Sequence, residues 1–269
     1  MDNRSNYLDL EVLHREPAQP RSAPPLLFIH GAYVGAWCWD EYFLDYFADR
    51  GYHASALSLS GHGASNGRDR LNWLSLRDYV DDVIKVVRTM PQPPVLIGHS
   101  MGGMVIQKYL EKRHVPAVVL MASVPPTGMW GMNWWIGLTR PQLFQELMLV
   151  QVGAANYTNY RQVRDALFSP DLPDPQALRY LNHTQPESMR ALFDMNGWDL
   201  PILLHQLPPA LVLGAGADAL IPRCSVATTA ALFNTEVQWF DDMAHVMMLE
   251  PQWVLVAEHI AQWLEYNGW

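Results

Sequence analysis

The first 122 residues alternate between short apolar segments of strand length and longer segments whose apolar residues recur at helical spacing. Candidate strands lie at about 8–12, 25–29, 52–59, 94–97 and 117–122. The segments 25–29 and 94–97 are apolar throughout, as strands buried on both faces of a parallel sheet are. Regular alternation of strand and helix predicts a doubly wound, mostly parallel α/β sheet.

Two of the intervening segments carry clear helix signals. Aromatic residues from Trp39 to Phe47 fall at helical spacing, and Gly51 is well placed to end that helix. Ser75 is followed three residues later by Asp78, which is typical of a capping box with Asp in place of the usual Glu or Gln. We therefore expect helices after the second and third candidate strands.

The alternation stops after Ser123. Residues 124–126, Val-Pro-Pro, are typical of a linker, and the following stretch indicates helices and loops without a strong strand. The pattern returns with a strand at 210–213, a helix near 224–233, a strand near 236–240 and a helix at 252–265. We therefore expect one sheet domain, formed by residues 1–124 and 201–269, with an inserted helical lid at 125–200.

The pattern Gly-x-Ser-x-Gly occurs twice, at 63–67 (GASNG) and at 98–102 (GHSMG). A nucleophile elbow needs a strand before it and a helix after it, and its glycines leave room for a strained turn that exposes the serine hydroxyl. The second match has both neighbours, which predicts Ser100 as a nucleophile. The first match lies in a glycine loop followed by charged residues, so Ser65 is expected to be a loop residue.

A serine nucleophile needs a base, and the base needs an acid that orients it. In this type of sheet the expected chain order is serine, then acid, then histidine, each after a strand. Asp218 follows the 210–213 strand, and His245 follows the last candidate strand. Asp241 and Asp242 compete as the acid because they lie near His245. An acid on the same loop seldom gets behind the imidazole ring, so both are interpreted as solvated.

The negative charge formed during acyl transfer needs donors, normally two backbone N–H groups. One is expected from Met101, directly after the serine. The second is expected from Ala32, in the loop after the 25–29 strand, where Gly31 lets the chain approach closely. His30 is interpreted as a residue that orients this loop, not as a base.

The start of the expected lid is rich in Met and Trp. It contains Met129, Trp130, Met132, Trp134 and Trp135. These residues either form an ordinary lid core or line an apolar acyl or alcohol pocket. In the second interpretation, Tyr33, Trp130, Trp134 and Trp135 bind substrate. Only 17% of the residues are charged, against about 25% in average proteins, so we expect exposed apolar surface at this Met/Trp-rich segment.

Composition argues against several classes of partner and cofactor. The chain has 18 Lys and Arg against 27 Asp and Glu, a net charge of −9 that repels nucleic acid. Two cysteines and the absence of metal-ligand spacing predict no metal and no cofactor. The N-terminus lacks the apolar core of a secretory signal, and no apolar run of 18 residues would span a membrane. We therefore expect a cytoplasmic protein, and the oligomeric state stays open.

Together these motifs resemble the α/β-hydrolase superfamily. The matching pieces are His30-Gly31-Ala32, residues 61–67 (GHGASNG), residues 98–103 (GHSMGG), Asp218 and His245. The 61–67 block is similar to the corresponding loop of monoacylglycerol-lipase-like members, and residues 30–39 resemble the opening of plant methylesterases and hydroxynitrile lyases. Ser58 departs from the family, which often has Asp there, and this weakens assignment to a subfamily. Ser instead of Asp at position 100 argues against epoxide hydrolases and haloalkane dehalogenases.

The resemblance and the residues together imply a serine hydrolase. It would cleave carboxylic esters with an apolar acyl or alcohol part, through an acyl-enzyme intermediate. Two alternatives remain open. The same triad could serve a C–C hydrolase, a hydroxynitrile lyase or a cofactor-free perhydrolase, although the only Lys residues are at 85, 108 and 112 and none lies in the lid. The chain could also be a ligand receptor that retains the triad.

Overall fold

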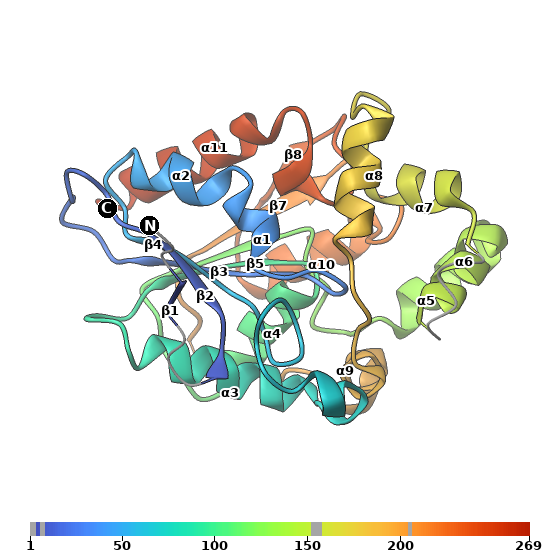
Figure 1. Ribbon diagram of the computed structural model, residues 1–269. Coiled ribbons are helices and arrows are strands. Elements are labelled where there is room, and N and C mark those ends of the chain that lie inside the picture. The colour runs from blue at the N-terminus through green and yellow to red at the C-terminus, as the bar shows by residue number, and fades with distance from the viewer. Residues whose placement is uncertain (1–3, 6–8, 152–157, 204–205) are drawn as a thin grey trace.

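The computed structural model describes residues 4–5, 9–151, 158–203 and 206–269 (Figure 1). At its centre lies an eight-stranded sheet with the strand order β1-β2-β4-β3-β5-β6-β7-β8. The strands are β1 (Arg4–Ser5), β2 (Val12–Arg15), β3 (Leu26–Ile29), β4 (Ala54–Leu57), β5 (Val95–His99), β6 (Val118–Met121), β7 (Ala210–Ala215) and β8 (Val237–Phe240). The pairings β1–β2 and β2–β4 are antiparallel and all the others are parallel, so the prediction of a mostly parallel sheet is confirmed.

Helices cover both faces of the sheet (Figure 1). One face is covered by α1 (Trp37–Asp40), α2 (Phe43–Ala48) and α11 (Trp253–Tyr266), and the other by α3 (Leu76–Val87), α4 (Met101–Tyr109) and α10 (Arg223–Leu232). In β3, Leu26 and Phe28 pack in the first core, whereas Leu27 and Ile29 pack in the second. Because both faces are covered, all four residues are buried and the strand is apolar throughout.

Both segments with helix signals are helical, but one of them is divided in two. The single helix expected from Trp39 is two short helices, because Tyr42 between them has an extended φ of −146°. Gly51 follows at a φ of +90°, which favours glycine. The Ser75 capping box is present: Ser75 Oγ accepts from the Asp78 N–H, and Asp78 Oδ2 accepts from the Ser75 N–H at 2.7 Å.

The first strand differs from the sequence expectation. Strand β2 begins at Val12, where the predicted segment ends, and runs to Arg15. Leu10 is buried but lies before the strand, and Leu8 lies outside the described residues. The alternation of Leu10 and Val12 therefore reflected burial on one side and not a continuous strand.

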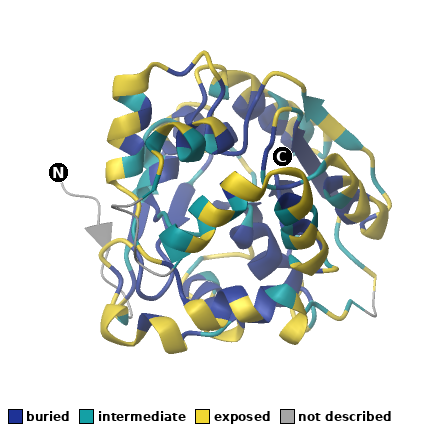
Figure 2. Ribbon diagram, turned by 90° about the vertical axis from the view of Figure 1, so that its right-hand side faces the viewer, coloured by how far each residue is buried: buried dark blue, intermediate teal, exposed yellow. Residues whose placement is uncertain are grey.

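A helical segment connects β6 to β7. It contains α5 (Trp130–Thr139), α6 (Pro141–Gln151), α7 (Tyr160–Leu167), α8 (Asp174–Asn182), α9 (Met189–Phe193) and the short turn η4 (Asp194–Trp198). Figure 1 shows α5 to α8 together on one side of the sheet, and Figure 2 shows the exposed surfaces of the helices on that side. The described part of this segment contains no strand. Among the described residues, no helix is both long and apolar enough to cross a membrane.

Candidate active site

Ser100 lies in the turn between β5 and α4, with a φ of +52° and a ψ of −115°. Positive φ is costly for a residue with a Cβ, and it occurs where the surroundings enforce it. Here the neighbouring glycines let backbone atoms pack closely enough to enforce the positive φ. A Cβ on Gly102 would lie 2.3 Å from the Ile29 carbonyl oxygen, and a Cβ on Gly98 would lie 2.7 Å from the carbonyl carbon of Gly102. The turn has the close packing that a nucleophile elbow requires.

Asp218 and His245 meet at the carboxyl end of the sheet. His245 Nδ1 lies 2.8 Å from Asp218 Oδ2, and both side chains are almost fully buried. The other oxygen, Oδ1, accepts the N–H groups of Leu220 and Ile221 at 2.7 and 2.9 Å. The carboxylate is therefore fixed in place. It accepts a hydrogen bond from Nδ1 of His245, so the ring proton lies on Nδ1 and Nε2 is free to act as a base.

The elbow is also tied to the histidine loop. His99 Nε2 donates to the carbonyl oxygen of His245 at 2.9 Å, and the two rings lie 4.7 Å apart. Burial, together with the neighbouring His245, holds the pKa of His99 well below its ordinary value, so the ring is neutral. This contact places the residue before Ser100 against the backbone of His245. Sequence analysis did not single out His99 for this role.

One competing acid, Asp241, and the competing serine have other partners. Asp241 forms an exposed ion pair with Arg223. Ser65 Oγ donates to the Ser58 carbonyl oxygen at 2.6 Å and accepts the Glu11 N–H at 2.8 Å. Ser65 is thus buried as a structural residue of the loop after β4, in agreement with its interpretation as a loop residue.

The two expected oxyanion donors border the same cavity as Ser100. Ala32 and Met101 both line it, and within the described part of the chain neither N–H has a hydrogen-bond acceptor. A Cβ on Gly31 would lie 2.8 Å from His99 Nδ1 and 3.2 Å from Ser100 Cβ, so only glycine lets this loop pass so close to Ser100. Among the hydrogen bonds of the described residues, none joins Ser100 to His245. In serine hydrolases, the hydrogen bond between these two side chains often tightens only when substrate binds.

His30 is fully buried behind this loop. Its Nδ1 lies 2.7 Å from the Gly31 carbonyl oxygen, and its Nε2 accepts the Leu59 N–H at 3.0 Å. Burial, and then the nearby His62, lower the pKa of His30 to about 3. A neutral ring with both nitrogens bonded to backbone orients the loop and is not available as a base.

The cavity that contains Ser100 and His245 has a volume of about 550 Å³. Its walls come from the loops after β3 and β5 and from helices α5 to α8. Tyr33 lines it, as expected, together with apolar residues that include Met129, Met132 and Ile136. The described lining contains no Asp, Glu, Lys or Arg. Such a space favours uncharged, largely apolar ligands.

The three tryptophans of α5 do not reach this cavity, contrary to the sequence-based expectation. The side chains of Trp130 and Trp134 are 71% and 67% exposed, and Trp135 packs against a small cluster that contains Ile136. The cavity side of α5 is occupied by Met132, Asn133 and Ile136, and Met129, directly before the helix, also lines the cavity. Because this helix is apolar on almost every side, the sequence alone does not distinguish its inner face from its outer face.

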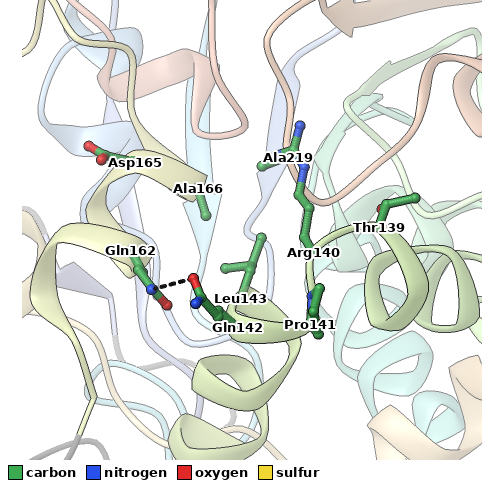
Figure 3. Close-up of a pocket in the computed structure, with 9 residues that line it drawn as sticks. All are labelled: Thr139, Arg140, Pro141, Gln142, Leu143, Gln162, Asp165, Ala166 and Ala219. Atoms are coloured by element: carbon green, nitrogen blue, oxygen red, sulfur yellow. Dashed lines mark hydrogen bonds between the residues drawn. The ribbon is translucent and has the colours of Figure 1, made fainter.

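A second cavity of about 450 Å³ lies between the α5–α6 junction, α7 and the loop after β7 (Figure 3). It is lined by Thr139, Arg140, Pro141, Gln142, Leu143, Gln162, Asp165, Ala166 and Ala219. Gln162 donates to Gln142 Oε1 at 3.3 Å across it. This cavity contains charged side chains and none of the candidate catalytic groups. No cluster of metal ligands occurs within the part of the chain that the structure describes.

Sequence analysis also missed Glu187, which lies between α8 and α9. Its carboxylate is buried and contacts both the loop after β3 and the loop after β4. No local pattern in the surrounding residues, Gln185-Pro186-Glu187-Ser188, indicates this contact, because Tyr33, His62 and Tyr79 lie more than 100 positions away.

Comparison with known proteins agrees with this architecture. The family model described as "Alpha/beta hydrolase family" matches residues 26–257. The chain is 26% identical over 157 residues to Methyl jasmonate esterase 1 of Vitis vinifera, covering 54% of this chain and 56% of that protein. It is 31% identical over 115 residues to Phospholipase YtpA of Bacillus subtilis (strain 168), covering 40% and 43%. The chain thus spans about half the length of the curated relatives it matches.

Among solved structures, an esterase from Exiguobacterium antarcticum has the same fold. Its TM-score is 0.72 at 15% identity, and the match covers 98% of this chain and 100% of that one. The family match extends from β3 to the last helix and includes the elbow, Asp218 and His245. The chain belongs to the alpha/beta hydrolase family.

Proposed function

We propose that this protein is a carboxylic ester hydrolase that cleaves uncharged esters with an apolar acyl or alcohol part. One observation carries the proposal: a cavity of about 550 Å³, whose described lining has no charged residue, contains Ser100, His245 and two backbone N–H groups that have no acceptor among the described residues. The names of two relatives, a methyl jasmonate esterase and a phospholipase, support ester hydrolysis as the reaction class.

In the proposed reaction, Ser100 Oγ attacks the ester carbonyl carbon while His245 Nε2 takes the hydroxyl proton. The resulting oxyanion accepts hydrogen bonds from the N–H groups of Ala32 and Met101. The C–O bond to the alcohol then breaks, and His245 returns the proton to the departing oxygen. Asp218 stabilises the transient imidazolium. Water, deprotonated by His245, then attacks the acyl carbon, the ester bond to Ser100 Oγ breaks as His245 returns the proton to Oγ, and the acid is released.

The uncharged lining has a consequence for product release. The ester is neutral, but the acid product carries a negative charge at neutral pH. A carboxylate in an apolar cavity without a cationic partner is strongly disfavoured. The cavity therefore binds the substrate better than the product, which favours turnover.

We also propose that residues 125–200 act as a lid on a core formed by 1–124 and 201–269. Helices α5 to α8 supply much of the cavity wall opposite Ser100. A cover of this kind excludes water and selects apolar groups, both of which assist acyl transfer.

The decisive test is Ser100→Ala measured on a panel of p-nitrophenyl esters that vary in acyl length. Wild type should hydrolyse uncharged esters and react with a fluorophosphonate, and the variant should lose at least about 10³-fold in kcat and all labelling, because no nucleophile remains. Circular dichroism of the variant should be unchanged. Equal activity in the variant, or cleavage of cyanohydrins without ester hydrolysis, would overturn the assignment.

A further inference from the structure

A buried ion pair lies beside the oxyanion loop. Glu187 Oε2 is 3.0 Å from His62 Nε2, and neither side chain is exposed to solvent. The other ring nitrogen of His62 lies 3.0 Å from the Ser60 carbonyl oxygen. Since both nitrogens face acceptors, both carry protons, and His62 is an imidazolium.

The carboxylate of Glu187 is satisfied on every side. Its Oε1 accepts the Tyr79 hydroxyl at 2.6 Å and the Ser188 N–H at 2.7 Å. Burial alone would raise the pKa of Glu187, but the charge of His62 and these donors lower it below its ordinary value. A charged pair is therefore sealed between the helical segment and the loop after β4.

The same short segment, 185–187, holds the backbone of Tyr33, the residue after the proposed oxyanion donor. The Gln185 N–H donates to the Tyr33 carbonyl oxygen at 2.8 Å, and the Tyr33 N–H donates to Glu187 Oε2 at a longer 3.4 Å. Tyr33 has a φ of +67°, a strained value for a residue other than glycine. Such a conformation persists only where its surroundings enforce it.

Gln185 extends the contact to the loop after β4. Its side chain accepts the Gly63 N–H at 2.9 Å and donates to the Gly61 carbonyl oxygen at 3.1 Å. The rings of His62 and His30 lie 5.0 Å apart, so the ion pair also borders the residue that orients the oxyanion loop. Residues 185–187 thus join both loops that follow the central strands β3 and β4.

We infer that Glu187, through its ion pair with His62 and its contact with Tyr33, is a positioning residue that holds the Ala32 N–H in place for the oxyanion. This inference rests on the proposed ester hydrolysis. It assigns the end of the helical segment a part in transition-state stabilisation as well as in covering the cavity.

The test compares Glu187→Gln with a matched control, Asp194→Asn. Asp194 is another fully buried carboxylate of the helical segment, and it accepts the Leu76 N–H at 3.1 Å and the Arg190 guanidinium at 2.8 Å. It contacts neither loop of the oxyanion region in the described structure. Both substitutions remove one buried charge with almost no change of shape.

Kinetics are measured per active site titrated with a fluorophosphonate, so that unfolded protein does not count. Glu187→Gln should lower kcat about tenfold or more with KM within about twofold, because a misplaced oxyanion donor affects the transition state and not substrate binding. Asp194→Asn should stay within about twofold of wild type in both constants. An unchanged kcat in Glu187→Gln, or an equal loss in Asp194→Asn, would overturn the inference.

Hydrogen exchange followed by mass spectrometry provides a readout that does not depend on turnover. Amides in residues 30–35 should exchange faster in Glu187→Gln and not in Asp194→Asn. If wild type fails to hydrolyse esters while exchange behaves as expected, the proposed function fails, but the role of Glu187 in holding the loop after β3 stands. Unchanged exchange would overturn that role itself. If Glu187→Gln does not fold, Glu187→Asp is measured in the same way. This variant keeps the negative charge but moves it back by one methylene.

Discussion

At the scale of single residues, two of the five described residues other than glycine with positive φ line the candidate site, and the other three are Asp9, Ala122 and Asn234. Ser100 and Tyr33 both have positive φ, at +52° and +67°. Each such conformation costs on the order of 1–3 kcal/mol and is maintained by neighbouring packing. Around Ser100 the neighbours are close backbone atoms that only glycines admit, and around Tyr33 they are residues 185–187. At these two positions the strain lies where reacting groups need exact placement.

The difference between an acid that orients the histidine and an acid that is solvated is also a difference between single residues. In Asp218→Asn, the oxygen bonded to the Leu220 and Ile221 N–H groups can stay, but an amide NH₂ then faces His245 Nδ1. The imidazole would turn to the wrong tautomer, with its proton on Nε2. We expect kcat to fall by about 10⁴-fold with little change in KM, as the equivalent change does in other triads.

Steady-state kinetics on a soluble p-nitrophenyl ester measure this effect, and Asp241→Asn provides the control. Asp241 pairs with Arg223 at the surface and does not contact His245. Its substitution should leave kcat within about twofold, since exposed ion pairs contribute only about 0–1 kcal/mol. Equal losses in the two variants would contradict the role given to Asp218.

At the scale of elements, α5 presents two different apolar faces. Trp130, Trp134 and Leu138 follow one another at helical spacing and are exposed, whereas Met132 and Ile136 are buried, and both line the cavity. The exposed face agrees with the low charge of the sequence, which indicated apolar surface at this segment. The exposed apolar surface was thus located correctly, but the residues that face the cavity were not.

We therefore predict that Trp130→Ser combined with Trp134→Ser leaves hydrolysis of short soluble esters within about threefold of wild type, because exposed side chains outside the cavity do not contact substrate. Met132→Ala should instead change the preference among acyl lengths, since it enlarges the cavity. The ratio of kcat/KM for a long and a short p-nitrophenyl ester measures this preference. A large shift of that ratio in the double Trp variant, with none in Met132→Ala, would contradict the placement of α5.

At the scale of the whole molecule, carboxylates join the helical segment to the core at several places. Glu187 pairs with His62, Glu250 accepts both the N–H and the hydroxyl of Ser169, and Asp199 forms ion pairs with groups on α3 and α4. Removal of one partner of a buried pair typically costs about 3–5 kcal/mol. The more exposed pairs contribute less.

The buried pair makes stability depend on pH. Burial alone would lower the pKa of His62, but Glu187 raises it above the ordinary 6.5, while His62 lowers the pKa of Glu187 below 4.5. The contribution of His62 is therefore complete below pH 6.5 and is lost as pH rises through its folded-state pKa. The contribution of Glu187 is lost as pH falls through its own folded-state pKa. Tyr79, His30 and Arg68 are the other titratable groups near His62.

We predict that the difference in unfolding free energy between wild type and His62→Gln is largest at about pH 5–6 and shrinks as pH rises above the ordinary histidine pKa. Urea unfolding at several pH values measures it. His53→Gln, at an exposed histidine that pairs with Glu16, should show a difference near zero throughout. A difference for His62→Gln that stays constant up to pH 9 would contradict the buried ion pair.

Much of the fold was predictable because its signals are local. Continuous apolar runs identified β3 and β5, the Ser75 capping box identified the start of α3, and the alternation of strand and helix predicted a mostly parallel sheet. Boundaries were less accurate, since Tyr42 breaks one expected helix and β2 begins at Val12. Such details depend on packing that a short window of sequence does not contain.

The sequence by itself determined the layered α/β sheet, the turn at Ser100 and the candidate acid and base, because periodicity and strand–turn–helix context are properties of neighbouring residues. The tertiary structure alone decided which face of α5 meets the cavity, and it brought the expected acid, Asp218, against His245. It also decided that Glu187 reaches His62 and Tyr33, which are 125 and 154 positions away. Contacts between residues so far apart in the sequence form only when the chain folds, and no local pattern encodes them.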